Sequence, residues 1–133
     1  MTYDKPLPRL DTLNAPFWAA AKQGRLLLQH CPACGDRRFP PGPVCPQCLA
    51  GDQDWVEASG KGTLESWIDM HRAYWDGFKA SLPYRVCLVR LEEGPVLVSN
   101  LLDKTEDLRI GAAVRVVFDA VTDAVTLPKF TLA

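Results

Sequence analysis

The sequence predicts a mainly β fold, in which a short N-terminal helix precedes a small cysteine-rich unit and a closed five-stranded barrel. Four of the five cysteines fall within residues 31–48, as two C-x-x-C pairs. From residue 55 onward, apolar residues recur with period two in a series of short runs. Only one short segment has helical spacing, and the 11 prolines and 9 glycines favour many turns over long helices.

Length, composition and charge limit the classes of protein to which this chain can belong. A chain of 133 residues suits one domain or one domain with a small appendage, and 47 % hydrophobic residues are enough to build a core. The formal charge of −1 gives no general attraction to nucleic acid or to acidic membranes. No run approaches the ~20 apolar residues that span a bilayer, and the N-terminus has no apolar run of signal-peptide length. We therefore expect a cytosolic protein with reduced thiols.

A short helix is predicted at residues 15–23, within an N-terminal helical segment that spans residues 1–28. Asn14 is a preferred N-cap residue, and Pro16 suits a first helical turn. Gly24 can end the helix, because glycine readily adopts the left-handed conformation found after helix C-termini.

Phe17 and Trp18 are neighbours in this helix, so their side chains point about 100° apart. We expect one ring to cover the chain's own core and Trp18 to be left for a partner protein, since exposed aromatic side chains are common interface anchors. In the alternative, both rings pack inside this chain.

The stretch "HCPACGDRRFPPGPVCPQC" predicts a four-thiolate metal site. Each C-x-x-C pair can turn both sulfurs toward one point, and the residues between the pairs let the chain turn back. Four thiolates suit tetrahedral zinc, although iron also accepts such a site. The predicted ligands, in a zinc ribbon at residues 29–52, are Cys31, Cys34, Cys45 and Cys48.

We expect this metal to be structural. Four thiolates leave no open position of the kind that a catalytic zinc keeps. Redox work by a C-x-x-C pair usually needs a thioredoxin-like βαβ context, which the pattern lacks. His30 adjoins Cys31, but four cysteines already complete the site, so His30 is expected to be a neighbour and not a ligand.

Residues 53–133 are predicted to form a barrel of the OB type, because five short antiparallel strands without a second layer must close to bury their apolar face. Strict alternation would place Leu64, Ile68 and Met70 on one face of the first strand. The stretches that carry the five strands are residues 62–71, 84–94, 95–103, 111–121 and 123–130.

The connection at residues 72–83 is long for a hairpin and rich in aromatic residues. In one interpretation, its aromatic side chains plug an end of the barrel. In the other, the loop binds a ligand or a partner, since loops at barrel ends commonly bind. The candidate residues are Arg72, Tyr74, Trp75, Phe78 and Lys79, together with Arg85 in the strand that follows.

No catalytic residues are predicted. Cys87 lies in the apolar run "RVCLVRL" and is expected to be a small core residue, because a nucleophilic cysteine needs a basic partner. His71 ends a strand, and no Ser/His/Asp arrangement or pair of acidic residues stands out in the chain. We therefore expect no complete active site in this chain alone.

The motifs "PFWAAAKQGRLLLQHCPACGDRRFPPGPVCPQC", "SGKGTLESW", "LPYRVCLVRLEEGPVLVSNL", "IGAAVRVVFD" and "LPKF" follow one another from residue 16 to residue 130. In this order they resemble the zinc-ribbon/OB-fold acyl-CoA-associated family. The resemblance implies a rubredoxin-like zinc ribbon followed by an OB barrel. It also implies an accessory subunit, in a hetero-oligomer with a thiolase-like, lipid-transfer-type or aldolase enzyme, or sometimes a hydratase, that acts on acyl-CoA.

Two functions fit these residues. In the first, the chain supports an enzyme of acyl-CoA metabolism, and basic side chains such as Arg72, Lys79 and Arg85 meet the phosphates of CoA. In the second, the chain binds single-stranded nucleic acid, with aromatic side chains such as Trp67 stacking on the bases. The isoelectric point near 6.1 counts against the second function, because such domains are usually basic.

Overall fold

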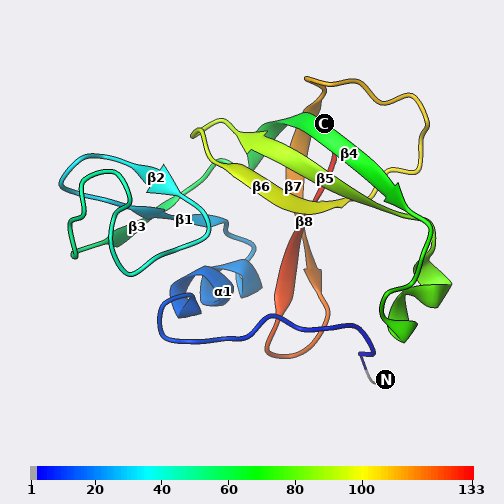
Figure 1. Ribbon diagram of the computed structural model, residues 1–133, viewed down its shortest axis with the longest axis horizontal. Helices are drawn as coiled ribbons and strands as arrows, with labels where there is room; N and C mark the ends of the chain where they lie inside the picture. The colour runs from blue at the N-terminus through cyan, green and yellow to red at the C-terminus, as the bar shows by residue number, and fades with distance from the viewer. Residues whose placement is uncertain (1–2) are drawn as a thin grey trace.

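The computed structural model describes residues 3–133 and divides them into a small sheet, a helix and a barrel. The helix α1 (Ala15–Lys22) lies in the angle between the small sheet and the barrel (Figure 1). The small sheet has the order β2-β1-β3, and the barrel has the order β4-β5-β6-β8-β7. The strands are β1 (Leu27–His30), β2 (Arg37–Arg38), β3 (Asp54–Glu57), β4 (Lys61–Met70), β5 (Tyr84–Leu91), β6 (Val96–Leu101), β7 (Ala113–Ala120) and β8 (Thr126–Leu132).

The barrel closes because its first strand pairs on both edges. β4 pairs with β5 along most of its length, and its first residues, 61–63, pair with residues 113–115 of β7. β6 and β8 run parallel and meet at Leu101 and Phe130. This is the strand order of an OB barrel, so the predicted mainly β fold and its five barrel strands are confirmed.

One continuous core joins the barrel to α1 and the small sheet. Leu64, Val89 and Phe130 are fully buried inside the barrel, where side chains from three strands meet. Phe17 of α1 and Leu28 of β1 belong to the same cluster. The helix is therefore fixed to the barrel by its buried aromatic ring, and the small sheet is fixed to both by β1.

The helix begins and ends close to the predicted residues, but its N-terminus differs. Gly24 has a φ of 74°, as expected of a residue that ends a helix. Asn14 holds the N-cap position in a helical conformation, and its side chain does not cap the helix. Instead, Asn14 and Asp11 exchange side-chain-to-backbone hydrogen bonds at 2.8 and 2.9 Å. The predicted N-cap residue is therefore confirmed, but it caps the helix without the side-chain hydrogen bond expected of asparagine. No helix within residues 3–133 combines the length and the apolarity needed to cross a membrane.

The first barrel strand contains an irregularity that reverses its faces. The pairing of β4 with β5 shifts between Leu64 and Ser66, as at a β-bulge. Leu64 is buried, but Ile68 is 56 % exposed and Trp67 packs against the core instead. The expected common face of Leu64, Ile68 and Met70 is therefore wrong, because one extra residue changes which side chains point inward.

Between β4 and β5 the chain forms the 3-10 helix η1 (Asp76–Ser81). Residues 3–14, which we call the N-terminal segment, run below the barrel from the side of η1 to α1 (Figure 1). The fit is close, since a Cβ on Gly77 would clash with the backbone oxygen of Asp4. This contact places the N-terminal segment across one end of the barrel.

Candidate metal centre and binding surfaces

The four cysteines lie on two turns of the same design. The amide of Gly35 donates to the carbonyl of Cys31 at 2.7 Å, and the amide of Leu49 donates to the carbonyl of Cys45 at 2.8 Å. Both turns need a positive φ at the residue after the second cysteine, 80° at Gly35 and 66° at Leu49. Glycine adopts this conformation freely, whereas leucine is strained in it. Leu49 is also 74 % exposed, so no packing within the chain offsets that strain.

The sulfur atoms are close enough to share one ion. The four cysteine Sγ atoms all lie within 4.8 Å of one another, and two of their separations, Cys31 to Cys48 and Cys34 to Cys45, are 3.6 Å. Four sulfurs arranged tetrahedrally at a zinc–sulfur distance of about 2.3 Å stand about 3.8 Å apart. The donor set therefore fits one tetrahedral metal ion, and its closed thiolate shell fits a structural role. When bound, such an ion cross-links the two turns and stabilises this small unit.

The pKa values of the thiols show that they compete for negative charge. Burial raises the pKa of Cys31, but hydrogen bonds, first from the backbone of Cys34 and then from Gln53, outweigh it and lower the pKa to about 6. A backbone hydrogen bond at Asp36 lowers the pKa of Cys34, yet burial and the neighbouring thiols raise it to about 12. A bound cation would remove this competition and allow all four thiols to ionise.

Arg38 brings a positive charge to the edge of the cysteine cluster. Its side chain is only 11 % exposed, and its guanidinium donates to Cys45 Sγ at 3.8 Å and to Asp36 Oδ2 at 3.0 Å. The same guanidinium donates to the side chain of Gln53, which follows the second turn. Arg38 therefore offsets part of the charge that four thiolates would place in the ribbon, and it ties both turns together.

The residue next to the first cysteine is held away from a ligand role. His30 Nδ1 lies 2.6 Å from Asp54 Oδ1, across the pairing of β1 with β3. In residues 3–133, the group found to be capable of holding a metal ion consists of the four cysteines and does not include His30. This contact thus links the strand that enters the ribbon to the strand that leaves it.

Cys87, the fifth cysteine, is a core residue. Its side chain is 1 % exposed in β5, and burial raises the pKa of its thiol to about 11. A buried, protonated thiol is a poor nucleophile. His71 is exposed at the end of β4.

The aromatic side chains of the connection at residues 72–83, which we call the aromatic loop, lie in two different environments. Phe78 turns inward and stacks on Tyr84, with ring centroids 4.9 Å apart. Tyr74 and Trp75 are 71 % and 54 % exposed, so they do not plug the barrel. Arg72 lies over the ring of Tyr74, with 4.8 Å between the guanidinium carbon and the centroid.

The predicted basic residues Lys79 and Arg85 also lie in different environments. Lys79 is exposed and lies 3.4 Å from Asp76 in an ion pair on the surface. Arg85 is 9 % exposed, and its Nε donates to Asp69 Oδ1 at 2.8 Å. Its Nη1 donates to the carbonyls of Asp103 and Thr105. Arg85 thus holds the loop after β6 against β5.

Trp18 stands between two grooves beside α1. It is half-buried and meets Phe17 edge-on, with ring centroids 4.9 Å apart. A groove of about 310 Å³ lies on one side, between α1 and the N-terminal segment. Another of about 190 Å³ lies on the other side, between α1 and strands β6 and β8, and Val98 lines it.

An apolar surface that the sequence did not predict adjoins Trp18. On the outside of the barrel, Leu88 pairs directly with Val98, and Ile68 pairs with Val86. Leu88 is 38 % exposed and Val98 69 % exposed. We call these four residues, Ile68, Val86, Leu88 and Val98, the outer apolar face. The bulge hides this face from a period-two pattern, because it brings Ile68 to the outside.

A chain that joins a four-cysteine zinc ribbon to an OB barrel belongs to a recognisable class of two-part proteins. The family model described as "ChsH2, rubredoxin-like zinc ribbon domain" matches residues 18–53. The model described as "ChsH2, C-terminal OB-fold domain" matches residues 55–119. The chain belongs to this ChsH2 family of zinc-ribbon and OB-fold proteins, which is also called DUF35.

Several relatives place the chain within this family. It is 36 % identical to a DUF35 domain-containing scaffold protein of Methanothermobacter thermautotrophicus, over 70 % of this chain and 71 % of that protein. It is 42 % identical to a probable enoyl-CoA hydratase alpha subunit of Thermomonospora curvata, over 95 % of this chain. The match spans only 39 % of that relative's length.

A solved structure described as the Ltp2-ChsH2(DUF35) aldolase has the same fold. The TM-score is 0.85 at 40 % sequence identity, and the match covers 95 % of this chain and 98 % of that chain. The likeness therefore extends over the ribbon, the helix and the barrel together.

Proposed function

We propose that this chain is an accessory, non-catalytic subunit of a thiolase-like, lipid-transfer-type or aldolase enzyme that acts on acyl-CoA, within a hetero-oligomer. The observation that carries the proposal is the outer apolar face, because the water-facing side of an antiparallel sheet is normally polar. The relatives support it, since they include a scaffold protein, a hydratase alpha subunit and an aldolase.

The contact surface that we propose combines the barrel with α1. Val98 belongs to the outer apolar face and also lines the groove beside Trp18. The ring of Trp18 is half-buried, which holds its orientation while it leaves an edge for a partner. A fixed aromatic ring beside exposed aliphatic side chains has the composition of an interface hot spot.

We propose a second, smaller role for the aromatic loop, near the active site of the partner enzyme. Tyr74 and Trp75 are exposed there, and Arg72 and Lys79 supply positive charge beside them. These side chains suit the pantetheine arm and the phosphates of CoA. Arg85 and Phe78 are turned into the chain, so in this proposal they hold the loop in place.

The isolated, zinc-loaded chain should not turn over acyl-CoA esters. Its buried thiol, Cys87, is protonated at neutral pH, because burial raises its pKa to about 11. A thioesterase or thiolase assay without partner tests this. Robust activity that is lost in Cys87→Ala or His71→Ala would contradict the proposal.

Co-expression with a candidate thiolase or aldolase tests the assembly itself. Val98→Lys places a charge on the outer apolar face and should abolish co-elution on size exclusion, while zinc content stays at one per chain. Ile110→Lys is the matched control, because Ile110 is 75 % exposed and lies outside that face. Trp18→Ala should weaken the complex, and Trp75→Ala should lower activity more than assembly. If the unmodified proteins elute separately and the enzyme has the same rate with and without this chain, the proposal fails.

A further inference from the structure

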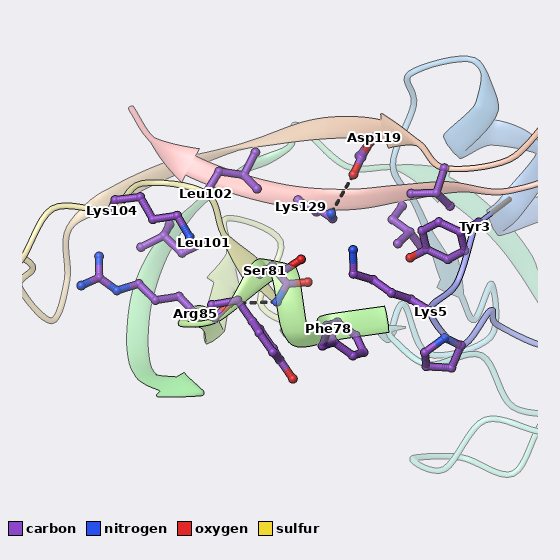
Figure 2. Close-up of a pocket in the computed structure, with 15 residues that line it drawn as sticks. Tyr3, Lys5, Phe78, Ser81, Arg85, Leu101, Leu102, Lys104, Asp119 and Lys129 are labelled. Carbon is purple, nitrogen blue, oxygen red and sulfur yellow. Dashed lines mark hydrogen bonds and ion pairs between the residues drawn. The ribbon is translucent and has the colours of Figure 1, made fainter. Parts of the chain in front are cut away.

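A pocket of about 270 Å³ opens at the end of the barrel, where the N-terminal segment, η1 and the turn between β7 and β8 meet. Phe78 forms one wall, and Leu101 forms part of the apolar lining (Figure 2). Leu127 also belongs to this lining. Tyr3 and Lys5 of the N-terminal segment line the pocket as well. The pocket thus depends on segments from both ends of the chain.

The walls of the pocket are held by specific contacts. Phe78 is fixed by its stack on Tyr84, and Gly77 leaves room for the backbone of Asp4 against η1. The amine of Lys5 lies 5.5 Å from the centroid of Phe78 and 5.8 Å from that of Tyr3. The N-terminal segment is therefore part of a formed site, with its lysine set between two rings.

The lining has more cationic than acidic side chains, in a chain whose net charge is −1. Four cationic side chains line the pocket, against one carboxylate among the described lining residues, that of Asp119. Lys129 already pairs with Asp119 at 2.7 Å. Within residues 3–133, Lys5 forms no ion pair. Figure 2 shows Lys5 pointing toward Lys129, while the guanidinium of Arg85 points away from both.

We propose that this pocket binds a small organic anion. The carboxylate or phosphate head of this ligand meets Lys5 and Lys129. Its apolar body rests on Phe78, Leu101 and Leu127. Lysine amines are point charges that accept either head group, so the shared chemistry is a negative head on an apolar body. The volume equals about nine water molecules, which suits a ligand of about that many heavy atoms. This site does not depend on the proposed partner, and it is tested on the isolated chain.

The test is a titration of the ¹⁵N-labelled, zinc-loaded chain, followed by amide chemical shifts. The probes are benzoate, phenyl phosphate, benzamide and inorganic phosphate. Benzoate or phenyl phosphate should shift amides of η1 and of residues 100–104, with a dissociation constant on the order of 1 mM for so small a ligand. The tighter of these two anions identifies the preferred head group. Benzamide and inorganic phosphate should bind at least about tenfold more weakly, because each lacks one half of the recognised chemistry.

Two substitutions of opposite sign make the assignment specific. Lys5→Gln should weaken binding of the aryl anion by about fivefold or more, since it removes a positive charge that meets the head group in this proposal. Asp119→Asn should tighten binding, because it frees Lys129 and removes a repelling carboxylate. Lys22→Gln and Asp123→Asn, which change the same charges outside the lining, are the matched controls.

Three results would overturn the proposal. One is the absence of any saturable shift up to about 20 mM of either aryl anion, well above the expected dissociation constant. Another is equal binding of benzamide and benzoate, which would mean that the lysines take no part. The third is an equal response of Lys5→Gln and its control, which would mean that the anion responds only to the net charge of the protein.

Discussion

Replacing Trp67 by threonine should destabilise the barrel far more than replacing Ile68 by threonine, although regular alternation along β4 predicts the reverse. The bulge between Leu64 and Ser66 turns Trp67 toward the core and leaves Ile68 56 % exposed. Threonine is β-branched and suits a strand, and both variants place this same residue in β4, so the difference between them mainly reports burial.

The size of the effect follows from the two exposures. A fully buried tryptophan typically loses 3–5 kcal/mol when truncated, and Trp67 is partly buried, so we expect a loss of about 2–3 kcal/mol. The more exposed side chain of Ile68 buries less apolar area, so we expect Ile68→Thr to lower the free energy of unfolding by about 0.5 kcal/mol or less. With a urea m-value of about 1–3 kcal/mol/M, the midpoint should fall by roughly 0.7–3 M for Trp67→Thr and by much less for Ile68→Thr.

Urea unfolding of the zinc-loaded protein, followed by far-ultraviolet circular dichroism at constant free zinc, measures both midpoints. Each variant must first be shown to retain one zinc per chain, because loss of the ribbon would lower stability for another reason. An unchanged m-value shows that the same structure unfolds in each case. If Ile68→Thr costs as much as Trp67→Thr, the reversed face of β4 is wrong, and so is the outer apolar face built on it.

Three further outcomes are expected. Arg38→Gln should weaken zinc retention by about tenfold or more in competition with a chelator, whereas the exposed neighbour Arg37→Gln should not, because only Arg38 touches the cysteine cluster. Burial raises the pKa of Asp103, but hydrogen bonds from Leu132 and Thr131 together outweigh it and lower the pKa below its ordinary value of 3.8. The free energy of unfolding that ionised Asp103 contributes is therefore present above that pH and is lost as the pH falls. The urea midpoint of Asp103→Asn should accordingly fall less steeply in acid than that of the natural chain. Leu49→Gly should keep or slightly raise stability, by up to about 1 kcal/mol in thermal unfolding, because relief of a strained φ outweighs the added freedom of the unfolded chain.

The metal site was predictable because its signal is local. Two residues between paired cysteines fix the geometry of each turn, and no knowledge of the rest of the fold is needed to see four ligands. The barrel strands were predictable for a similar reason, since alternation of apolar residues is a property of neighbours in the chain. The predicted boundary between ribbon and barrel, at residue 53, stays a prediction.

The bulge in β4 and the barrel-end pocket carry no such signal. A bulge needs only one extra residue, and nothing in "GTLESWIDMH" marks where it lies. Lys5, Lys104 and Lys129 line one pocket, yet they come from the N-terminal segment, the connection after β6 and β8. Only closure of the barrel brings them together, and sequence spacing cannot show that closure. The same holds for Trp18 and Val98, which share a groove only because α1 lies against β8.

The metal site and the proposed contact surface are linked through the core. Cys31 directly follows β1, and Leu28 of β1 lies in the same buried cluster as Phe17. Phe17 fixes the rotation of α1, and that rotation sets Trp18 beside Val98. A structural metal that orders β1 therefore also orders the edge of the outer apolar face, although no cysteine belongs to that face. If the proposed contact surface is used, the ribbon would contribute to docking by holding the helix in place against the barrel.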